Sequence, residues 1–120
     1  MPKRLKDLDP SQLGRLLGVP EDRRIMGDEI IRLHLFNRKK MNWYLAAYSP
    51  VSRTFFGYFE NPMDTMTSGF YALEDILSYG KKGEEWEPHV DDSWKPVPAK
   101  DILKLQGYIE YVKHGIDDFT

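Results

Sequence analysis

Apolar and polar positions alternate along residues 30–48, and this alternation predicts two strands. The apolar members of the first strand are Ile31, Leu33 and Leu35. In the second strand one face carries Trp43, Leu45 and Ala47, and the other carries Tyr44, Ala46 and Tyr48. A basic turn at 37–41 joins the two strands, so they are expected to form a hairpin.

An aromatic run at 54–60 (TFFGYFE) predicts a third strand whose two faces are both covered. Phe56 and Tyr58 point to one side of an extended chain, and Phe55 and Phe59 point to the other. Gly57, in the middle, indicates a bulge or the close approach of another backbone. We interpret the run as a central strand. A stacking platform for bases is the alternative, which the absence of Lys and Arg from the run disfavours.

A short fourth strand at 69–71 would complete an antiparallel meander, after which helical spacing takes over. Leu73, Ile76 and Leu77 predict a short helix that stops at Gly80. A last amphipathic helix is expected from Pro98 to Gly115. Its apolar stripe consists of Ile102, Leu105, Ile109 and Val112.

A helix is also expected near the N-terminus, with Asp9 as its N-cap, Pro10 in its first position and Gln12 completing a capping box. Its apolar stripe consists of Leu13, Leu16 and Leu17. The elements together predict a single α+β domain over 1–120, with a frayed tail at 115–120. The sheet is antiparallel with about four to five strands. An N-terminal helix, a short helix after the fourth strand and a C-terminal amphipathic helix accompany it.

Residues 81–98 hold a dense cluster of Pro, Gly and charged residues, together with Trp86 and Trp94. Long loops of this kind are either functional or pinned by their aromatic residues. We expect this loop to be ordered, because each indole can bury enough apolar area to anchor it.

Composition narrows the function classes. The chain has 120 residues, which suits one ordinary domain with one core. Its formal net charge of -2 provides no overall attraction to nucleic acid or to an anionic membrane. The absence of cysteine excludes disulfides, thiolate zinc sites and cysteine nucleophiles. With no apolar stretch of about 20 residues and a charged start, the chain is expected to be cytoplasmic and without a membrane span.

Several features stand in order along the chain: residues 33–36 (LHLF), Trp43, residues 55–57 (FFG), residues 69–76, and Asp91 with Trp94 and Pro96. In this order they resemble the bacterial family called domain of unknown function 2958, small proteins often encoded on plasmids and integrative elements. The likeness runs from the first helix to about Pro98. It implies a small α+β domain and an origin on a mobile genetic element, and it brings no activity and no catalytic residues.

The chain departs from that family at two positions. Members tend to have Ser, a helix cap, where this chain has Ala72. They tend to have His where this chain has Ser93, so a site that rests on that His is not expected here.

A candidate metal site lies in the late loop. Three carboxylates and an imidazole fall within six residues (EPHVDD), a ligand set used by hard ions and by mixed oxygen and nitrogen sites. These ligands are Glu87, His89, Asp91 and Asp92. The alternative is an acidic surface loop, because the loop has no EF-hand spacing and no His-x-x-x-His pair. His34 and His114 are interpreted as structural.

Two further sets of residues are candidates for binding. Arg38, Lys39 and Lys40 make a basic hairpin tip that could contact phosphates, or a solubilising turn that discourages edge pairing. The aromatic surface candidates are Tyr44, Tyr48, Trp86 and Trp94.

The missing catalytic motifs and the surplus of aromatic residues favour a non-enzymatic accessory protein of a mobile element that acts by protein–protein binding. No cofactor is expected, and the protein partner is unidentified. One alternative is a nucleic-acid-binding module that uses the basic hairpin tip. Another is a metal-dependent enzyme that uses the 87–92 loop.

Overall fold

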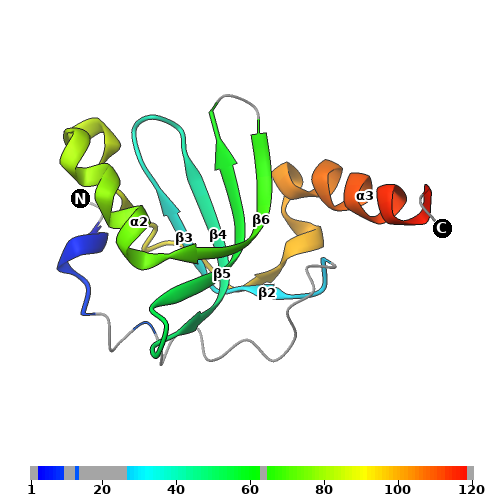
Figure 1. Ribbon diagram of the computed structural model, residues 1–120, viewed down its shortest axis with the longest axis horizontal. Helices are drawn as coiled ribbons and strands as arrows, with labels where there is room; N and C mark the ends of the chain where they lie inside the picture. The colour runs from blue at the N-terminus through cyan, green and yellow to red at the C-terminus, as the bar shows by residue number, and fades with distance from the viewer. Residues whose placement is uncertain (1–2, 10–12, 14–26, 63–64, 119–120) are drawn as a thin grey trace.

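A six-stranded antiparallel sheet forms the centre of the molecule (Figure 1). The computed structural model describes residues 3–9, 13, 27–62 and 65–118. The strands lie in the order β1-β7-β3-β4-β5-β6. Their bounds are β1 (Lys3–Arg4), β3 (Leu33–Phe36), β4 (Asn42–Ser49), β5 (Thr54–Asn61), β6 (Thr65–Ala72) and β7 (His89–Val90).

A second, two-stranded sheet and two helices complete the regular structure of the described residues. The small sheet pairs β2 (Ile30–Ile31) with β8 (Val97–Pro98). The helices are α2 (Leu73–Ser78) and α3 (Leu103–Asp118). Short 3₁₀ turns occupy Leu5–Asp7, Tyr79–Lys82, Glu84–Trp86 and Ala99–Asp101. No helix among the described residues is both long enough and apolar enough to cross a membrane.

The structure confirms the α+β class and the meander, which is β3-β4-β5-β6. The sheet has more strands than expected, because β7 from the late loop pairs with β3 and β1 pairs with β7. Both added strands are two residues long and too short to show an alternation of their own. The first predicted strand is divided, since its start at β2 joins the small sheet.

The helix predictions have mixed outcomes. The short helix is confirmed as α2. The C-terminal helix is confirmed as α3, but it begins at Leu103 and not at Pro98, which lies in β8. Gly115 does not end α3, which continues to Asp118, because a glycine weakens a helix by only about 1 kcal/mol. The frayed tail at 115–120 stays a prediction. Most of the predicted N-terminal helix lies outside the described residues; Leu13, from its apolar stripe, is helical and buried.

A bulge in β4 changes which side chains share a face. The pairing of β4 with β5 shifts register between Leu45 and Ala47, so Ala46 is an extra residue. Tyr48 therefore joins Trp43 and Leu45 in one core, rather than lying on the face of Tyr44 as expected. A one-residue insertion moves every later side chain to the opposite face.

Gly57 lies where another backbone approaches closely, as its position in the aromatic run predicts. A Cβ atom at this position would collide with the Tyr44 carbonyl oxygen and would lie 2.9 Å from the Leu45 Cα. Leu45 and Phe56 are buried in the sheet, with exposed fractions of 0% and 3%.

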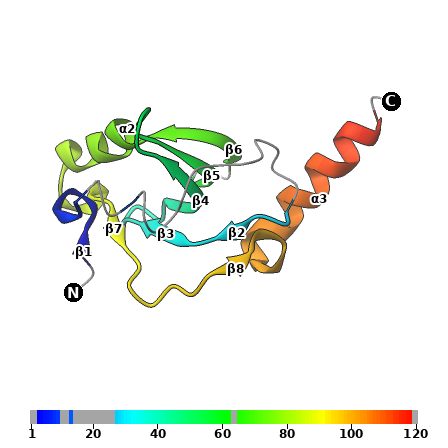
Figure 2. The ribbon, with the colours of Figure 1, turned by 90° about the horizontal axis from the view of Figure 1, so that it is seen from below.

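Two hydrophobic cores lie on opposite faces of the sheet. On the face that we call the α2 face, Leu73 and Ile76 of α2 pack against sheet residues such as Trp43. On the other, the α3 face, Leu105 and Ile109 of α3 pack with residues of β2, β4 and β5. Figure 2 shows α2 on the upper side of the strands, and β2 and β8 on the lower side. The outer part of α3 projects beyond the sheet (Figure 1).

Candidate functional site

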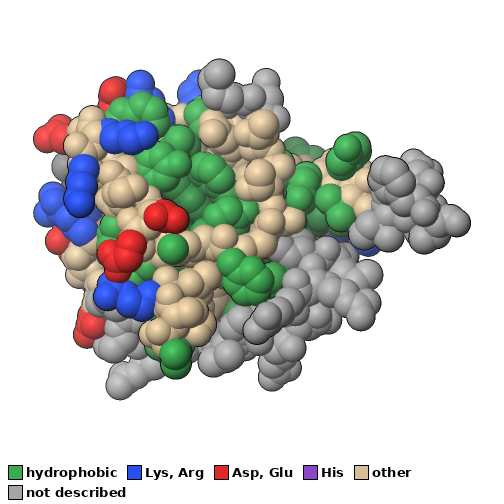
Figure 3. Space-filling model, viewed as in Figure 1, with side chains coloured by type: hydrophobic (Ala, Val, Ile, Leu, Met, Phe, Trp, Pro, Cys, Tyr) green, Lys and Arg blue, Asp and Glu red, His purple; other side chains and the backbone are tan. Residues whose placement is uncertain are grey.

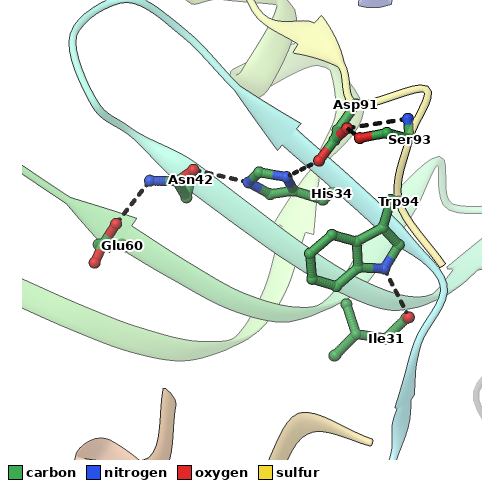
Figure 4. Close-up of polar contacts among 7 residues, drawn as sticks. All are labelled: Ile31, His34, Asn42, Glu60, Asp91, Ser93 and Trp94. Atoms are coloured by element: carbon green, nitrogen blue, oxygen red, sulfur yellow. Dashed lines mark hydrogen bonds and ion pairs between the residues drawn. The ribbon is translucent and has the colours of Figure 1, made fainter. Parts of the chain in front are cut away.

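A chain of hydrogen-bonded polar side chains crosses the α3 face (Figure 4). His34 of β3 is at its centre, with Nδ1 2.8 Å from Asp91 Oδ2 and Nε2 2.7 Å from Asn42 Oδ1. Ser93 Oγ donates to Asp91 Oδ1 at 2.7 Å. The chain continues to β5, where Asn42 Nδ2 donates to Glu60 Oε1 at 2.7 Å. It thus links the late loop to three strands.

The orientation of Asn42 determines what its neighbours can do. Its Nδ2 faces two acceptors, Glu60 Oε1 and the Lys40 carbonyl oxygen at 3.2 Å, so its Oδ1 is the atom turned toward His34. His34 therefore has an oxygen acceptor at each ring nitrogen.

Ser, His and Asp meet here in an order that does not suit a serine nucleophile. In a catalytic triad the histidine lies between serine and aspartate and takes the serine proton. Here Ser93 bonds Asp91 directly, and both nitrogens of His34 are occupied by other groups. The arrangement therefore differs from a catalytic triad, in which the histidine accepts the serine proton.

Burial and hydrogen bonding shift two titrating groups of this chain. Burial acts to raise the pKa of Asp91, but hydrogen bonds from His34 and Ser93 outweigh it and hold the pKa below its ordinary value. Burial, with a smaller contribution from the charge of Glu60, raises the pKa of Tyr44 to about 12. Asp91 is therefore an ionised acceptor and Tyr44 a neutral phenol at pH 7.

Two adjoining hollows lie beside this polar chain. One, of about 410 Å³, is lined by His34, Phe36, Asn37, Lys40, Asn42, Asp91 and Lys104. The other, of about 320 Å³, is lined by Lys40, Glu60, Asn61, Pro62, Thr65, Met66 and Lys104. Lys40 and Lys104 line both hollows, so the two form one groove across the turn end of the sheet. Lys104 Nζ lies 3.3 Å from Glu60 Oε1.

The structure separates the three residues of the basic hairpin tip. Arg38 is exposed. Lys39 belongs to the α2 face, with its Nζ 3.3 Å from Glu85 Oε1 and 5.1 Å from the Trp86 ring centroid. Lys40 lines the groove on the α3 face. The tip is therefore not one continuous phosphate-binding patch.

The four predicted metal ligands are also dispersed. Asp91 bonds His34, and Asp92 is exposed. Glu87 Oε1 lies 3.6 Å from Lys6 Nζ, and His89 is beside the Phe36 ring. Across the described ranges, no three His, Asp or Glu side chains gather as a metal site requires. Two hydrogen bonds attach the late loop to the sheet: Asn37 Nδ2 donates to the Trp86 carbonyl oxygen, and Trp94 Nε1 donates to the Ile31 carbonyl oxygen.

The aromatic surface prediction is wrong for two of its four members. Tyr44 is 4% exposed because its ring stacks on His34 and lies near Trp94. Tyr48 is 1% exposed because the β4 bulge turns it into the α2-face core, against Phe55. Trp86 and Trp94 are half-buried.

Other aromatic side chains form a partly exposed stripe on the α2 face. Each contacts the next, with ring centroids 5.1 to 6.3 Å apart. In order they are Trp86, Tyr79, Trp43, Phe59 and Tyr71, which we call the aromatic stripe. All but Trp43 are half-buried. Figure 3 shows hydrophobic side chains gathered in a hollow beside α2 on this face.

The stripe ends at β6, the last strand of the sheet. Within the described part of the chain β6 pairs with β5 alone, so its outer edge has no strand beside it. Its eight residues (TMTSGFYA) include no charge and no proline. Natural proteins usually protect such an edge with one or the other. Phe70, in this strand, is 51% exposed.

Sequence reasoning missed Asn42, Glu60 and Lys104. Asn42 and Glu60 are directly opposite each other on β4 and β5, so the register of the meander would have paired them. His34 and Asp91 are 57 residues apart, and no local pattern connects them. Comparison with protein-family models, curated proteins and solved structures finds no significant match to this chain.

Proposed function

We propose that this chain is a non-enzymatic protein-binding module and that an extended segment of its partner adds to the sheet along β6. The open, uncharged edge of this eight-residue strand is the observation that carries the proposal. Strand addition is a common mode of peptide recognition: main-chain hydrogen bonds supply affinity and alternate side chains supply specificity.

Side chains on both sides of β6 would suit such a segment. Tyr71 and Phe59 of the aromatic stripe lie toward the α2 face, and their rings are 6.0 Å apart. Phe70 lies toward the α3 face, 5.1 Å from the Phe56 ring. An added strand would place its alternate side chains over these two aromatic pairs. Apolar side chains at alternate positions of the partner are therefore expected.

The chemistry of the edge favours protein over nucleic acid. Residues 65–72 include no Lys or Arg to contact phosphates. Both ring nitrogens of His34 are engaged, so this histidine does not support an enzymatic role as a free base. The origin on a mobile element stays a separate prediction, and the binding proposal does not depend on it.

The substitution Thr67→Lys tests the proposal, because Thr67 is exposed in β6 and a lysine at a sheet edge opposes strand pairing. Peptides selected from a random library on the wild-type chain should bind Thr67→Lys about tenfold more weakly or worse. A tenfold loss of affinity is similar in size to the net contribution of one hydrogen bond. Bound peptide should protect the backbone amides of 65–72 from hydrogen exchange.

Val51→Lys is the matched control, because it adds the same charge at a residue that is 96% exposed in the β4–β5 turn. It should bind the selected peptides like the wild type. Equal binding by Thr67→Lys, or bound peptide that leaves the β6 amides unprotected, would contradict strand addition at this edge.

A further inference from the structure

The groove on the α3 face has the size of a small-ligand site. Its hollows, about 410 and about 320 Å³, each fall in the range typical of such sites, roughly 300 to 1,000 Å³. They meet at Lys40 and Lys104, which come from opposite sides: the β3–β4 turn and the first turn of α3. A ligand that spanned the two hollows would pass between two ammonium groups.

The charges at this junction favour an anion. Glu60 is the acidic residue among them, and its Oε1 already accepts hydrogen bonds from Asn42 and Lys104. Asp91, at the far end of the larger hollow, accepts from His34 and Ser93. The acidic groups are thus engaged within the protein. Because Lys104 is paired with Glu60, Lys40 brings the cation beyond that pair to the point where the hollows meet.

The backbone of Lys40 supplies an independent observation. Its φ of 65° lies in the left-handed region, which glycine adopts freely and other residues adopt at a cost. The turn is held there from both sides: Lys40 N donates to the Asn37 carbonyl oxygen, and Asn42 Nδ2 donates to that of Lys40. Strained positions that their surroundings enforce are often functional. The enforced turn fixes the position from which the Lys40 side chain lines the groove.

We infer that this groove binds a phosphodiester, with the phosphate between Lys40 and Lys104 and one substituent in each hollow. A phosphodiester is a single anion that carries a group on either side, which matches two hollows joined at a pair of cations. Phe36 in one hollow and Met66 in the other offer apolar contacts to those groups. Single-stranded nucleic acid and free dinucleotides share this chemistry.

The site is separate from the β6 edge in its chemistry and in most of its residues. It uses cations on the α3 face, whereas strand addition uses the backbone of β6. Thr65 and Met66 belong to both β6 and the smaller hollow. Failure of either proposal leaves the other intact, because Thr67→Lys and the lysine variants below change different groups.

The test is a nuclear magnetic resonance titration of the wild-type chain with thymidylyl-thymidine, oligothymidylate and inorganic phosphate. Amide shifts are expected at Lys40 and Asn42 for the larger hollow and at Thr65 and Met66 for the smaller. Lys40→Gly and Lys104→Gln should each weaken dinucleotide binding by about tenfold, because each removes a charge-assisted contact to the phosphate. Lys40→Gly is expected to fold, since glycine favours this φ, and thermal unfolding checks it.

Arg53→Gly is the matched control. Arg53 also has a positive φ, 54°, and pairs with Glu74 away from the groove. Like Lys40→Gly, the substitution removes one positive charge and places glycine at a positive φ. It should leave dinucleotide binding unchanged.

The inference would be overturned if millimolar dinucleotide caused no change in the amide chemical shifts. It would also be overturned if Arg53→Gly weakened dinucleotide binding as much as the lysine variants do, or if inorganic phosphate bound as tightly as the dinucleotide. Binding of the oligonucleotide well above the dinucleotide would support it with nucleic acid as the source. Equal binding of the two would support a free dinucleotide.

Discussion

At the scale of single residues, Gly57 explains how two adjacent strands fit together. The aromatic residues on either side of it fill both cores, yet position 57 itself has no room for a side chain. The nearest atoms are backbone atoms of Tyr44 and Leu45, which the sheet holds in place. A glycine in the middle of a strand usually weakens it, but here it is the residue that lets β4 approach.

Gly57→Ala should therefore lower the free energy of unfolding by about 3 kcal/mol or more, because the added methyl group overlaps backbone that cannot shift cheaply. Urea denaturation measures this change. Gly107→Ala is the control, since Gly107 lies in α3 with open space around its Cβ position. It should raise stability by up to about 1 kcal/mol. A small loss in Gly57→Ala would mean that β4 and β5 can separate.

At the scale of elements, the late loop is attached to β3 by a charged hydrogen bond. Asp91 N donates to the His34 carbonyl oxygen at 3.0 Å, and the two side chains meet at 2.8 Å. Trp94 adds its indole hydrogen bond to Ile31. The loop is thereby anchored by a carboxylate as well as by apolar contact, which makes the attachment sensitive to acid.

The pKa of Asp91 is lower in the folded chain than in the unfolded chain, so the ionised carboxylate favours folding. This stabilisation is present above about pH 4, the ordinary pKa of Asp, and is lost as pH falls through the folded value. Asp91→Asn should cost about 1–3 kcal/mol at pH 7 and should flatten the fall of stability in acid. Urea denaturation from pH 7 to pH 3 measures both effects.

Asp92→Asn is the control for that experiment, because Asp92 is the exposed neighbour of Asp91. It should retain the acid dependence of the wild type. An unchanged acid dependence in Asp91→Asn would mean that the hydrogen bonds to His34 and Ser93 do not stabilise the fold.

Some of these elements can be predicted from the sequence, and others cannot. Alternation and helical spacing identify β3, β4, β5, α2 and α3, because each is long enough to show its period. The strands β1, β7 and β8 have two residues each and exist only because a neighbouring strand offers its edge. The amino-acid sequence around Ala46 has no feature that predicts the bulge. Of the residues of the candidate site, Asp91 and Lys40 were therefore proposed singly from the sequence, and Asn42, Glu60 and Lys104 were missed.

The hairpin tip gives a second example at this scale. The sequence predicts one basic patch at residues 37–41 (NRKKM). In the structure the turn places Lys39 on the α2 face and Lys40 on the α3 face. Adjacent charges in a sequence share a surface only where the backbone directs their side chains together. Of the three predicted residues, Lys40 is the one that lines the groove on the α3 face, together with Lys104 from a distant helix.

At the scale of the whole molecule, the stability of both cores depends on the protonation of tyrosine hydroxyl groups. Tyr58 of β5 donates to Glu29 Oε1, connecting the sheet to the segment before β2. Burial raises the pKa of Tyr58 above its ordinary range, and its hydrogen bond to Glu29 and the charge of Glu29 raise it further. The pKa values of Tyr44 and Tyr71 are also raised, chiefly by burial.

A raised tyrosine pKa means that the folded chain holds the phenol proton more tightly than the unfolded chain does. The stabilisation is complete below about pH 10, the ordinary pKa of Tyr, and is lost as pH rises through the folded value. The free energy of unfolding should therefore fall steeply above about pH 10, and loss of circular dichroism should coincide with the ultraviolet absorbance of tyrosinate. Tyr58→Phe should lower stability at pH 7 by about 1–2 kcal/mol and make the alkaline fall shallower.

Tyr111→Phe is the control for the alkaline prediction, because Tyr111 is 76% exposed on α3. This substitution should change neither the stability at pH 7 nor the steepness of its fall above about pH 10. If most of the tyrosinate absorbance developed near pH 10 while the circular dichroism stayed native, the buried phenols would be ionising inside the folded protein. The two cores would then not depend on neutral tyrosines. If absorbance and unfolding rise together, the sheet and its two covering layers unfold as one cooperative unit.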